Sequence, residues 1–173
     1  MEYYDLFDKN GNRLDKHVPR GAQLNKGEYF KVIHVWIENQ AGEFLIQQRA
    51  KDSDPIPYQW GITTGLVNVG ETPKKAASRE VEEEVGLAID GNALTKLDVI
   101  TSSRGKYNTI TYVYYHQTTK SIDCFTPNPA EVKAVKYVDF ETIQTMIEKK
   151  TFWDYPFLLN DKDYFKVLER RLR

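Results

Sequence analysis

The sequence has little of what marks a secreted or membrane protein. It has one cysteine, Cys124, among 173 residues, which excludes an intramolecular disulfide framework and a zinc site built from several cysteines. Its first residues form neither a basic segment nor an apolar one, so no signal peptide is visible. No apolar run approaches the roughly 20 residues that span a bilayer. We therefore expect a cytoplasmic protein without a membrane partner.

The chain also lacks an excess of charge of either sign. It has 24 Lys and Arg against 25 Asp and Glu, for a formal net charge of −1. A near-neutral chain has no general attraction for a nucleic acid polymer, and we expect none as a partner. Hydrophobic residues make up 40% of the chain and charged residues 28%, which excludes a disordered protein. The length favours a single domain over residues 1–173.

The pattern of apolar and turn residues predicts a mixed α/β protein. An aromatic segment, Glu2–Phe7, runs into an Asn10-Gly11 turn and predicts an amino-terminal hairpin within about residues 1–28. Helices are expected at Glu141–Lys149 and Asp161–Leu172. Strands are expected at residues 29–38, 43–48, 60–64, 94–101, 108–117 and 131–138. Strands on both sides of a central helix, with further helices at the end, indicate a sandwich of helices and sheet.

The central helix has clear start and stop signals. Thr72 is a good N-cap and Pro73 suits the first helical position. Ala77, Val81 and Val85 recur every four residues and can form a buried stripe. A glycine, Gly86, then provides a natural end.

Three carboxylates share one face of this helix. Glu80, Glu83 and Glu84 stand at i, i+3 and i+4, so they repel one another unless cations offset their charge. Oxygen ligands without Cys or His suit a hard cation such as Mg²⁺, with Mn²⁺ as a second choice. Arg79 can pair with Glu83, and Glu71 can bend back from the preceding loop. A glutamate-rich helix alone, however, is more often a solvated surface, as expected for Glu82.

A rarer pattern surrounds these glutamates. The segment Gly65–Leu87 reads GLVNVGETPKKAASREVEEEVGL. It resembles the Nudix box, the signature of the Nudix hydrolase family, at every defined position. The matching residues are Gly65, Glu71, Arg79, Glu80, Val81, Glu83, Glu84, Gly86 and Leu87. The resemblance implies an α/β/α sandwich with a mixed β-sheet, in which residues 65–87 form a loop–helix–loop. It also implies a MutT-like pyrophosphohydrolase that uses divalent metal.

The resemblance also implies roles for individual residues. Glu80, Glu83 and Glu84 would be the metal-site glutamates, one of them serving as general base while water attacks phosphorus. Arg79 would orient a glutamate within this catalytic group. Glu71 would support the site. The choice of base stays open among the glutamates.

Further candidates lie around the box. Gly65 supports the site, and its backbone carbonyl, or that of Thr64, can supply a further metal ligand. Glu131, in a distal loop, is a weaker candidate for a ligand or base. Arg49 ends a strand, where a phosphate contact and a structural role are equally expected. The implied substrate is a nucleoside diphosphate linked to another moiety, and a homodimer is compatible with family habit.

The likeness extends to one branch of the family. The segments Pro19-Arg20-Gly21, His34–Ile37 and Leu45–Arg49 resemble Nudix proteins related to isopentenyl diphosphate isomerase. Those isomerases place a catalytic cysteine just before the box glycine and a metal-binding histidine just after it. Here these positions hold Thr64 and Leu66, which disfavours isomerase activity. A non-catalytic nucleotide-binding Nudix domain is a third reading, and the complete set of box glutamates argues against it.

Several aromatic and histidine side chains have simpler expectations. His34 lies in an apolar strand and is expected in the core rather than in catalysis. Tyr112 and Tyr114 share one face of a strand, either as core or as pocket lining. Trp153, Phe157 and Tyr164 are expected to anchor the carboxyl-terminal helices.

Overall fold

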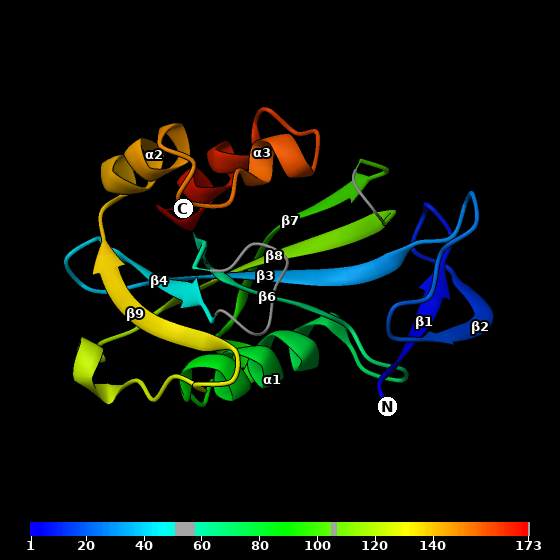
Figure 1. The fold of residues 1–173 in the computed structure, drawn as a ribbon, viewed down its shortest axis with the longest axis horizontal. Coiled ribbons are helices and arrows are strands. Elements are labelled where there is room, and N and C mark those ends of the chain that lie inside the picture. Colours follow the sequence, from blue (N-terminus) through cyan, green and yellow to red (C-terminus); the bar gives the residue numbers. More distant parts are fainter. Residues whose placement is uncertain (51–57, 105–106, 173) are drawn as a thin grey trace.

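Helices cover both faces of one mixed β-sheet (Figure 1). The computed structural model describes residues 1–50, 58–104 and 107–172. Within these residues the sheet has seven strands, in the order β5-β4-β3-β8-β7, while β6 pairs with β3 and β9 pairs with β4. The strands are β3 (Phe30–Glu38), β4 (Phe44–Arg49), β5 (Trp60–Gly61), β6 (Thr63–Leu66), β7 (Thr95–Ser102), β8 (Thr109–Gln117) and β9 (Val132–Val138). The α/β sandwich expected from the sequence is confirmed.

The two central strands meet at one end and then part. In the β3–β4 pairing, Glu38 lies opposite Phe44, at the turn that joins them. Farther along, β3 pairs with β6 and β4 pairs with β5 and β9. The segment 60–66 therefore crosses from one strand to the other, and the sheet opens between them. The sheet is mixed, because β3 and β8 are parallel whereas the other pairs of its strands are antiparallel.

Helix α1 (Pro73–Val85) forms as its capping signals predict. The Thr72 hydroxyl accepts a bond from the Lys75 amide at 3.3 Å, and Gly86 ends the helix with φ +74°. The buried stripe of α1 packs on the sheet with Ile33 and Val67. This packing also fixes the neighbouring face of the helix, which carries Glu80 and Glu84, toward the sheet at the opening between β3 and β4.

The other face of the sheet is covered by α2 (Phe140–Glu148), α3 (Tyr155–Leu158) and the 3₁₀ helix η4 (Tyr164–Leu172). The helix expected over residues 161–172 is therefore partly wrong. The amides of Tyr164 and Lys166 bond to carbonyls three residues earlier, which is the tighter 3₁₀ pattern. Its side chains Tyr164, Val167 and Leu168 are buried, so packing, rather than helix propensity, sets the geometry.

The prediction that three aromatic side chains anchor this layer is correct for two of them. Tyr164 is fully buried and accepts a bond from the Trp36 indole at 2.9 Å. Trp153 packs at the edge of the same core. Phe157, by contrast, is 61% exposed, so its anchoring role was wrong: it faces outward on α3 with the Arg104 guanidinium 4.5 Å from its ring centre. Tyr114 and Tyr112 belong to the core beneath α1.

The predicted amino-terminal hairpin is present beside the sheet. Strands β1 (Tyr3–Phe7) and β2 (Arg13–Pro19) are antiparallel, and Gly11 takes the positive φ that the turn requires. The hairpin is attached to the box loop, because the Val69 amide bonds to the Tyr3 carbonyl at 3.0 Å.

Short 3₁₀ turns, η2 (Gly91–Ala93) and η3 (Ile122–Cys124), complete the elements in the described ranges. None of the helices in those ranges is long and apolar enough to cross a membrane. The cytoplasmic location and the single-domain organisation stay predictions.

Candidate active site

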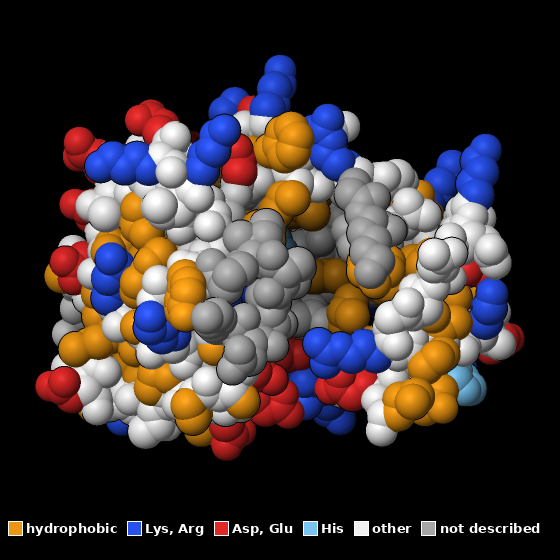
Figure 2. All heavy atoms as spheres, viewed as in Figure 1, with side chains coloured by type: hydrophobic (Ala, Val, Ile, Leu, Met, Phe, Trp, Pro, Cys, Tyr) orange, Lys and Arg blue, Asp and Glu red, His pale blue; other side chains and the backbone are white. Residues whose placement is uncertain are grey.

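A cavity of about 330 Å³ opens where β3 and β4 part, under the glutamate face of α1. Figure 2 shows the hollow on this face of the molecule, with acidic and basic side chains next to each other along its lower edge. The residues that line it come from the hairpin, the sheet, α1 and the loop before β9. They are Glu2, Tyr4, Arg20, Val32, Gln47, Arg49, Thr64, Gly65, Leu66, Glu80, Glu83, Glu84 and Glu131.

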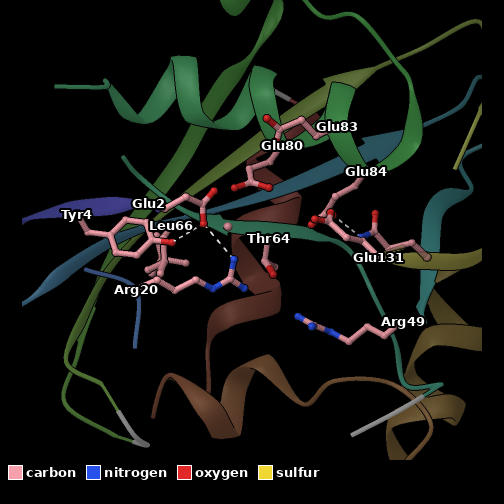
Figure 3. A pocket seen from close by; sticks show the side chains of 13 residues that line it. Glu2, Tyr4, Arg20, Arg49, Thr64, Leu66, Glu80, Glu83, Glu84 and Glu131 are labelled. Atoms are coloured by element: carbon pink, nitrogen blue, oxygen red, sulfur yellow. Dashed lines mark hydrogen bonds and ion pairs between the residues drawn. The ribbon is translucent and has the colours of Figure 1, made fainter. Parts of the chain in front are cut away.

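The three box glutamates converge on this cavity, as the helical spacing predicts. Figure 3 shows Glu80 and Glu84 projecting from α1 toward the side of the cavity with Thr64 and Arg49, while Glu83 lies closer to the helix. Glu131 enters next to Glu84 from the loop before β9. Glu82, in contrast, is exposed to solvent as expected.

Arg79 ties the glutamates to the loop before the helix. Its guanidinium bonds to both carboxylate oxygens of Glu71, at 2.8 and 3.0 Å. One further nitrogen reaches Glu80 at 2.9 Å and Glu83 at 3.2 Å. These bonds, above all those to Glu71, raise the pKa of Arg79 despite its partial burial. Glu71 therefore bends back as expected, and it holds the arginine without itself lining the cavity.

Gly65 is required by close approach rather than by backbone conformation. A Cβ atom at this position would overlap the carboxyl carbon and oxygen of Glu80. The Glu80 carboxylate thus lies directly over the backbone of β6. Gly65 and Glu80 are 15 positions apart in the box, and the structure gives a physical reason for pairing them.

Burial makes the negative charge of two glutamates costly. It is the largest cause that raises the pKa of Glu80 to about 7 and that of Glu84 to about 8. Neighbouring carboxylates, including Glu131, add to both increases. Arg79 opposes the effect at Glu80, and the hydrogen bond from the Gln47 amide opposes it at Glu84. The site therefore favours the arrival of a positive charge.

The donor atoms suit Mg²⁺ in kind, though they are not gathered around one point. Among the described residues, no group of three or more His, Cys, Asp or Glu side chains is placed to hold a metal. Glu80 and Glu83 turn to Arg79, and Glu84 accepts from Gln47. Mg²⁺ is commonly held by one or two carboxylates, with water and substrate phosphates completing its shell. The residues present fit that mode of binding.

Two arginines face the glutamates across the cavity. Figure 3 shows Arg49 and Arg20 on the side away from α1. Arg49 lies at the end of β4, with its guanidinium 5.5 Å from the centre of the Trp153 ring. Arg20 directly follows β2 and pairs with Glu2 at 3.0 Å. Acidic and basic walls thus stand opposite each other, an arrangement that fits a metal-bound polyphosphate between them.

A second cavity of about 210 Å³ adjoins the first. The two share Val32, Gln47, Arg49 and Thr64 as common walls. The remaining walls are mostly apolar or aromatic: Gly61, Ile62, Trp153, Tyr155, Leu158 and Leu159, together with His34. His34 is buried, with its Nδ1 2.8 Å from the Tyr164 hydroxyl. The expectation that it belongs to the core is confirmed, and it also forms part of this apolar cavity.

Some cavity residues were missed from the sequence. Gln47 binds both Glu84 and the Thr63 hydroxyl. Its position two residues before Arg49 on a strand places both on one face, and this signal was available. Glu2 and Tyr4 had no such signal, because the hairpin reaches the cavity only through tertiary packing. Arg20 appeared only within the branch likeness.

Comparisons with known proteins find matches over most of the chain. The family model "NUDIX domain" matches residues 29–160. An uncharacterised Nudix hydrolase of Listeria innocua is 33% identical over 91% of this chain and 92% of its own length. Nudix hydrolase 3 of Arabidopsis thaliana is 32% identical over 97% of this chain, which spans only 23% of that protein. Isopentenyl-diphosphate Delta-isomerase 1 of mouse is 24% identical over 83% of this chain and 72% of its own length.

Solved structures show the same fold at low identity. A Deinococcus radiodurans protein matches with a TM-score of 0.76 at 18% identity, covering 93% of this chain and 98% of its own. The NUDIX domain of Shewanella oneidensis NrtR, complexed with ADP ribose, matches with a TM-score of 0.63 at 15% identity over 92% and 96%. A bifunctional Francisella tularensis enzyme, complexed with AMP and a manganese ion, matches with a TM-score of 0.61 at 18% identity. The match covers 83% of this chain and 42% of that enzyme. By the family model and these relatives, the chain belongs to the Nudix hydrolase family.

Proposed function

We propose that this protein hydrolyses a diphosphate bond in a nucleoside diphosphate linked to another moiety, with Mg²⁺ as cofactor and Mn²⁺ as a substitute. Nudix-type diphosphate hydrolysis is what family membership supports. The observation that carries the finer proposal is the opposition of two walls. Buried glutamates with raised pKa values lie on α1, and two arginines face them across a cavity lined by both.

The proposed division of labour follows from the positions of the side chains. Glu80, Glu83 and Glu84 would hold Mg²⁺, which when bound neutralises phosphate charge and acidifies a water molecule. The Gly65 backbone carbonyl and Glu131 are further candidate ligands at the same cavity.

The remaining charged residues would position the glutamates and the substrate. Arg79, fixed by Glu71, would hold Glu80 and Glu83 in place. Arg49 would bind phosphate at the junction of the two cavities. Water would attack one phosphorus as one of the box glutamates takes its proton. The bridging P–O bond would break, and the phosphate of the other moiety would leave. The choice of base stays open among Glu80, Glu83 and Glu84.

The apolar cavity supports a place for the uncharged part of the substrate. Because it shares Arg49 and Thr64 with the acidic cavity, a group attached to a bound diphosphate reaches it directly. ADP ribose and AMP are bound by two proteins of the same fold, which recommends both nucleotide classes for testing. A homodimer stays a prediction.

The decisive experiment is chromatographic detection of the nucleoside monophosphate and the other phosphorylated product from a panel of nucleotides, with and without Mg²⁺. Nucleoside di- and triphosphates, nucleotide sugars, ADP-ribose and dinucleoside polyphosphates form the panel. We expect Mg²⁺-dependent turnover of at least one, and loss of that turnover in Glu83→Gln and Glu84→Gln. Glu82→Gln is the matched control, because Glu82 lies on the same helix, exposed and outside the cavity lining. Full turnover in both variants would remove the assignment.

The alternatives give different results in the same panel. Isomerase activity stays disfavoured, because Thr64 and Leu66 occupy the positions where the isomerases have cysteine and histidine, although mouse isomerase is a relative. An isomerase assay on isopentenyl diphosphate separates that activity from hydrolysis. Tight nucleotide binding without any hydrolysis would instead indicate a non-catalytic binding domain.

A further inference from the structure

The amino-terminal hairpin forms part of the cavity wall, although it precedes the segment that matches the family model. That match begins at residue 29, whereas Glu2, Tyr4 and Arg20 all line the cavity. Figure 3 shows these three side chains together, with the Glu2 carboxylate toward Glu80 and Arg20 farther from α1. The hairpin therefore adds side chains to a site whose glutamates come from the box.

The hairpin is held firmly against the box loop. The Gly70 amide bonds to the Asp5 carboxylate at 3.1 Å, and Phe7 pairs with Tyr29 at the start of the sheet. The Tyr4 ring is buried and packs edge-on against Phe30 with ring centres 5.6 Å apart. These contacts place the end of β2, and Arg20 after it, at a defined position relative to the glutamates.

The Arg20 guanidinium carries more N–H donors than its pairing with Glu2 uses. Its described ion pair joins Nη1 to the Glu2 carboxylate at 3.0 Å, and the Tyr4 hydroxyl donates to the same carboxylate oxygen, also at 3.0 Å. A guanidinium carries five N–H donors in a planar fork that matches phosphate. The Arg20 side chain is 74% exposed, so little desolvation opposes a new contact. A substrate phosphate can take the place of the Glu2 carboxylate as the partner of the Arg20 guanidinium.

We propose that Arg20 binds a phosphate group of the substrate and that Glu2 holds the arginine in readiness when the site is empty. The hairpin is then a substrate-binding element, and the anion it recognises is a diphosphate or longer polyphosphate. This inference rests on the proposed function of the same cavity. Arg20 meets the phosphate on the side away from α1, and Glu2 competes with the substrate for the guanidinium.

Opposite effects of two variants test the inference. Arg20→Ala removes a charge-assisted contact and is expected to raise KM about tenfold with little change in kcat. Arg20→Lys keeps the charge without the fork and should recover part of the loss. Glu2→Gln frees the guanidinium and should lower KM. That gain should shrink in the Arg20→Ala background, whereas an undiminished gain would show a general charge effect and overturn the role of Glu2.

Arg13→Ala is the matched control for damage to the hairpin. Arg13 lies on β2 and pairs with Asp5 at 3.1 Å, and it does not line the cavity. An increase in KM as large as that of Arg20→Ala would overturn the inference, as would an unchanged KM in Arg20→Ala.

A binding experiment keeps this test separate from the proposed function. Calorimetry with inorganic pyrophosphate and Mg²⁺ needs no turnover, and Arg20→Ala should weaken binding about tenfold relative to the unmodified protein. A protein that binds pyrophosphate through Arg20 and hydrolyses nothing would contradict the proposed function alone. Equal pyrophosphate binding by both proteins would overturn the inference while leaving hydrolysis untouched.

Discussion

At the scale of single residues, two glycines of the box leave space that a Cβ atom would fill. Gly65 leaves room for the Glu80 carboxylate above β6. Gly86 similarly leaves room for Thr126 beyond the helix end, and its φ of +74° favours glycine as well. These two glycines of the box thus each leave space for a side chain from another part of the chain, a contact that local sequence patterns do not reveal.

Gly65→Ala is expected to lower activity strongly without unfolding the protein. The added methyl group displaces the Glu80 carboxylate, and misplacement by about 1 Å can cost roughly a hundredfold in rate. Steady-state kinetics and a thermal melt check this expectation. Gly91→Ala is the control, because its added Cβ would make only ordinary contacts and Gly91 lies outside the cavity. Equal kinetics of the two variants would contradict the role given to Gly65.

Glu84→Gln should stabilise the metal-free protein at alkaline pH while removing activity. The carboxyl has a pKa raised from 4.5 to about 8 in the folded state, so the folded protein binds more protons than the unfolded chain between these values. Stability from this group therefore falls as pH rises through the window. Thermal melts in the presence of a chelator should give the variant a higher Tm than the unmodified protein at pH 8. Near pH 4.5 the two proteins should have the same Tm. Glu82→Gln, which alters an exposed carboxylate, should show no such pH-dependent gain.

At the scale of elements, strand β3 joins the site to the carboxyl-terminal layer. Its residues His34 and Trp36 both bond to the hydroxyl of Tyr164 in η4. The same strand lends Val32 to both cavities. The layer that closes the apolar cavity is therefore fixed by a polar contact buried in the core.

Acidification should weaken this junction through His34. Burial lowers its pKa from 6.5 to about 3, so the unfolded chain takes up a proton first. Stability should fall as pH drops from about 6.5 toward 3, by up to roughly 1.4 kcal/mol per pH unit from this group. Denaturant unfolding of His34→Asn should show a lower stability at pH 7 and a flatter dependence on pH in that window. An unchanged slope would show that His34 does not contribute this dependence.

At the scale of the whole molecule, the divergence of β3 and β4 creates the site. The acidic cavity lies between α1 and the hairpin, and the apolar cavity extends toward α3. Three parts of the chain that are distant in sequence therefore meet around two adjoining cavities. This geometry predicts that phosphate binding and recognition of the attached group can be separated by mutation.

Leu158→Glu should separate them. Leu158 lines the apolar cavity from α3, and a carboxylate there opposes an uncharged group. We expect KM for the best nucleotide of the panel to rise about tenfold or more, with binding of Mg²⁺ and pyrophosphate kept. Phe157→Glu is the control, because Phe157 is its exposed neighbour outside the cavity. Equal losses of nucleotide and pyrophosphate binding would argue against a separate compartment.

The sequence by itself determined the elements that depend on local patterns. The capping signals and apolar stripe of α1 predicted its ends and buried face, and the same spacing predicted that Glu80, Glu83 and Glu84 converge. Short-range periodicity carries this information, because a helix or strand orders neighbours only three, four or two residues apart. The complete box likewise indicated the family before any geometry was known.

Tertiary structure decided what local patterns do not encode. It brought Arg20 and Glu2 to the cavity that Glu80 lines, turned residues 164–172 into a 3₁₀ helix, and left Phe157 exposed. It also raised the pKa values of Glu80 and Glu84, since burial and the approach of Glu131 depend on the whole fold. These contacts join parts of the chain that are distant in sequence. Packing and desolvation, rather than local spacing, therefore determine the positions and pKa values of these side chains.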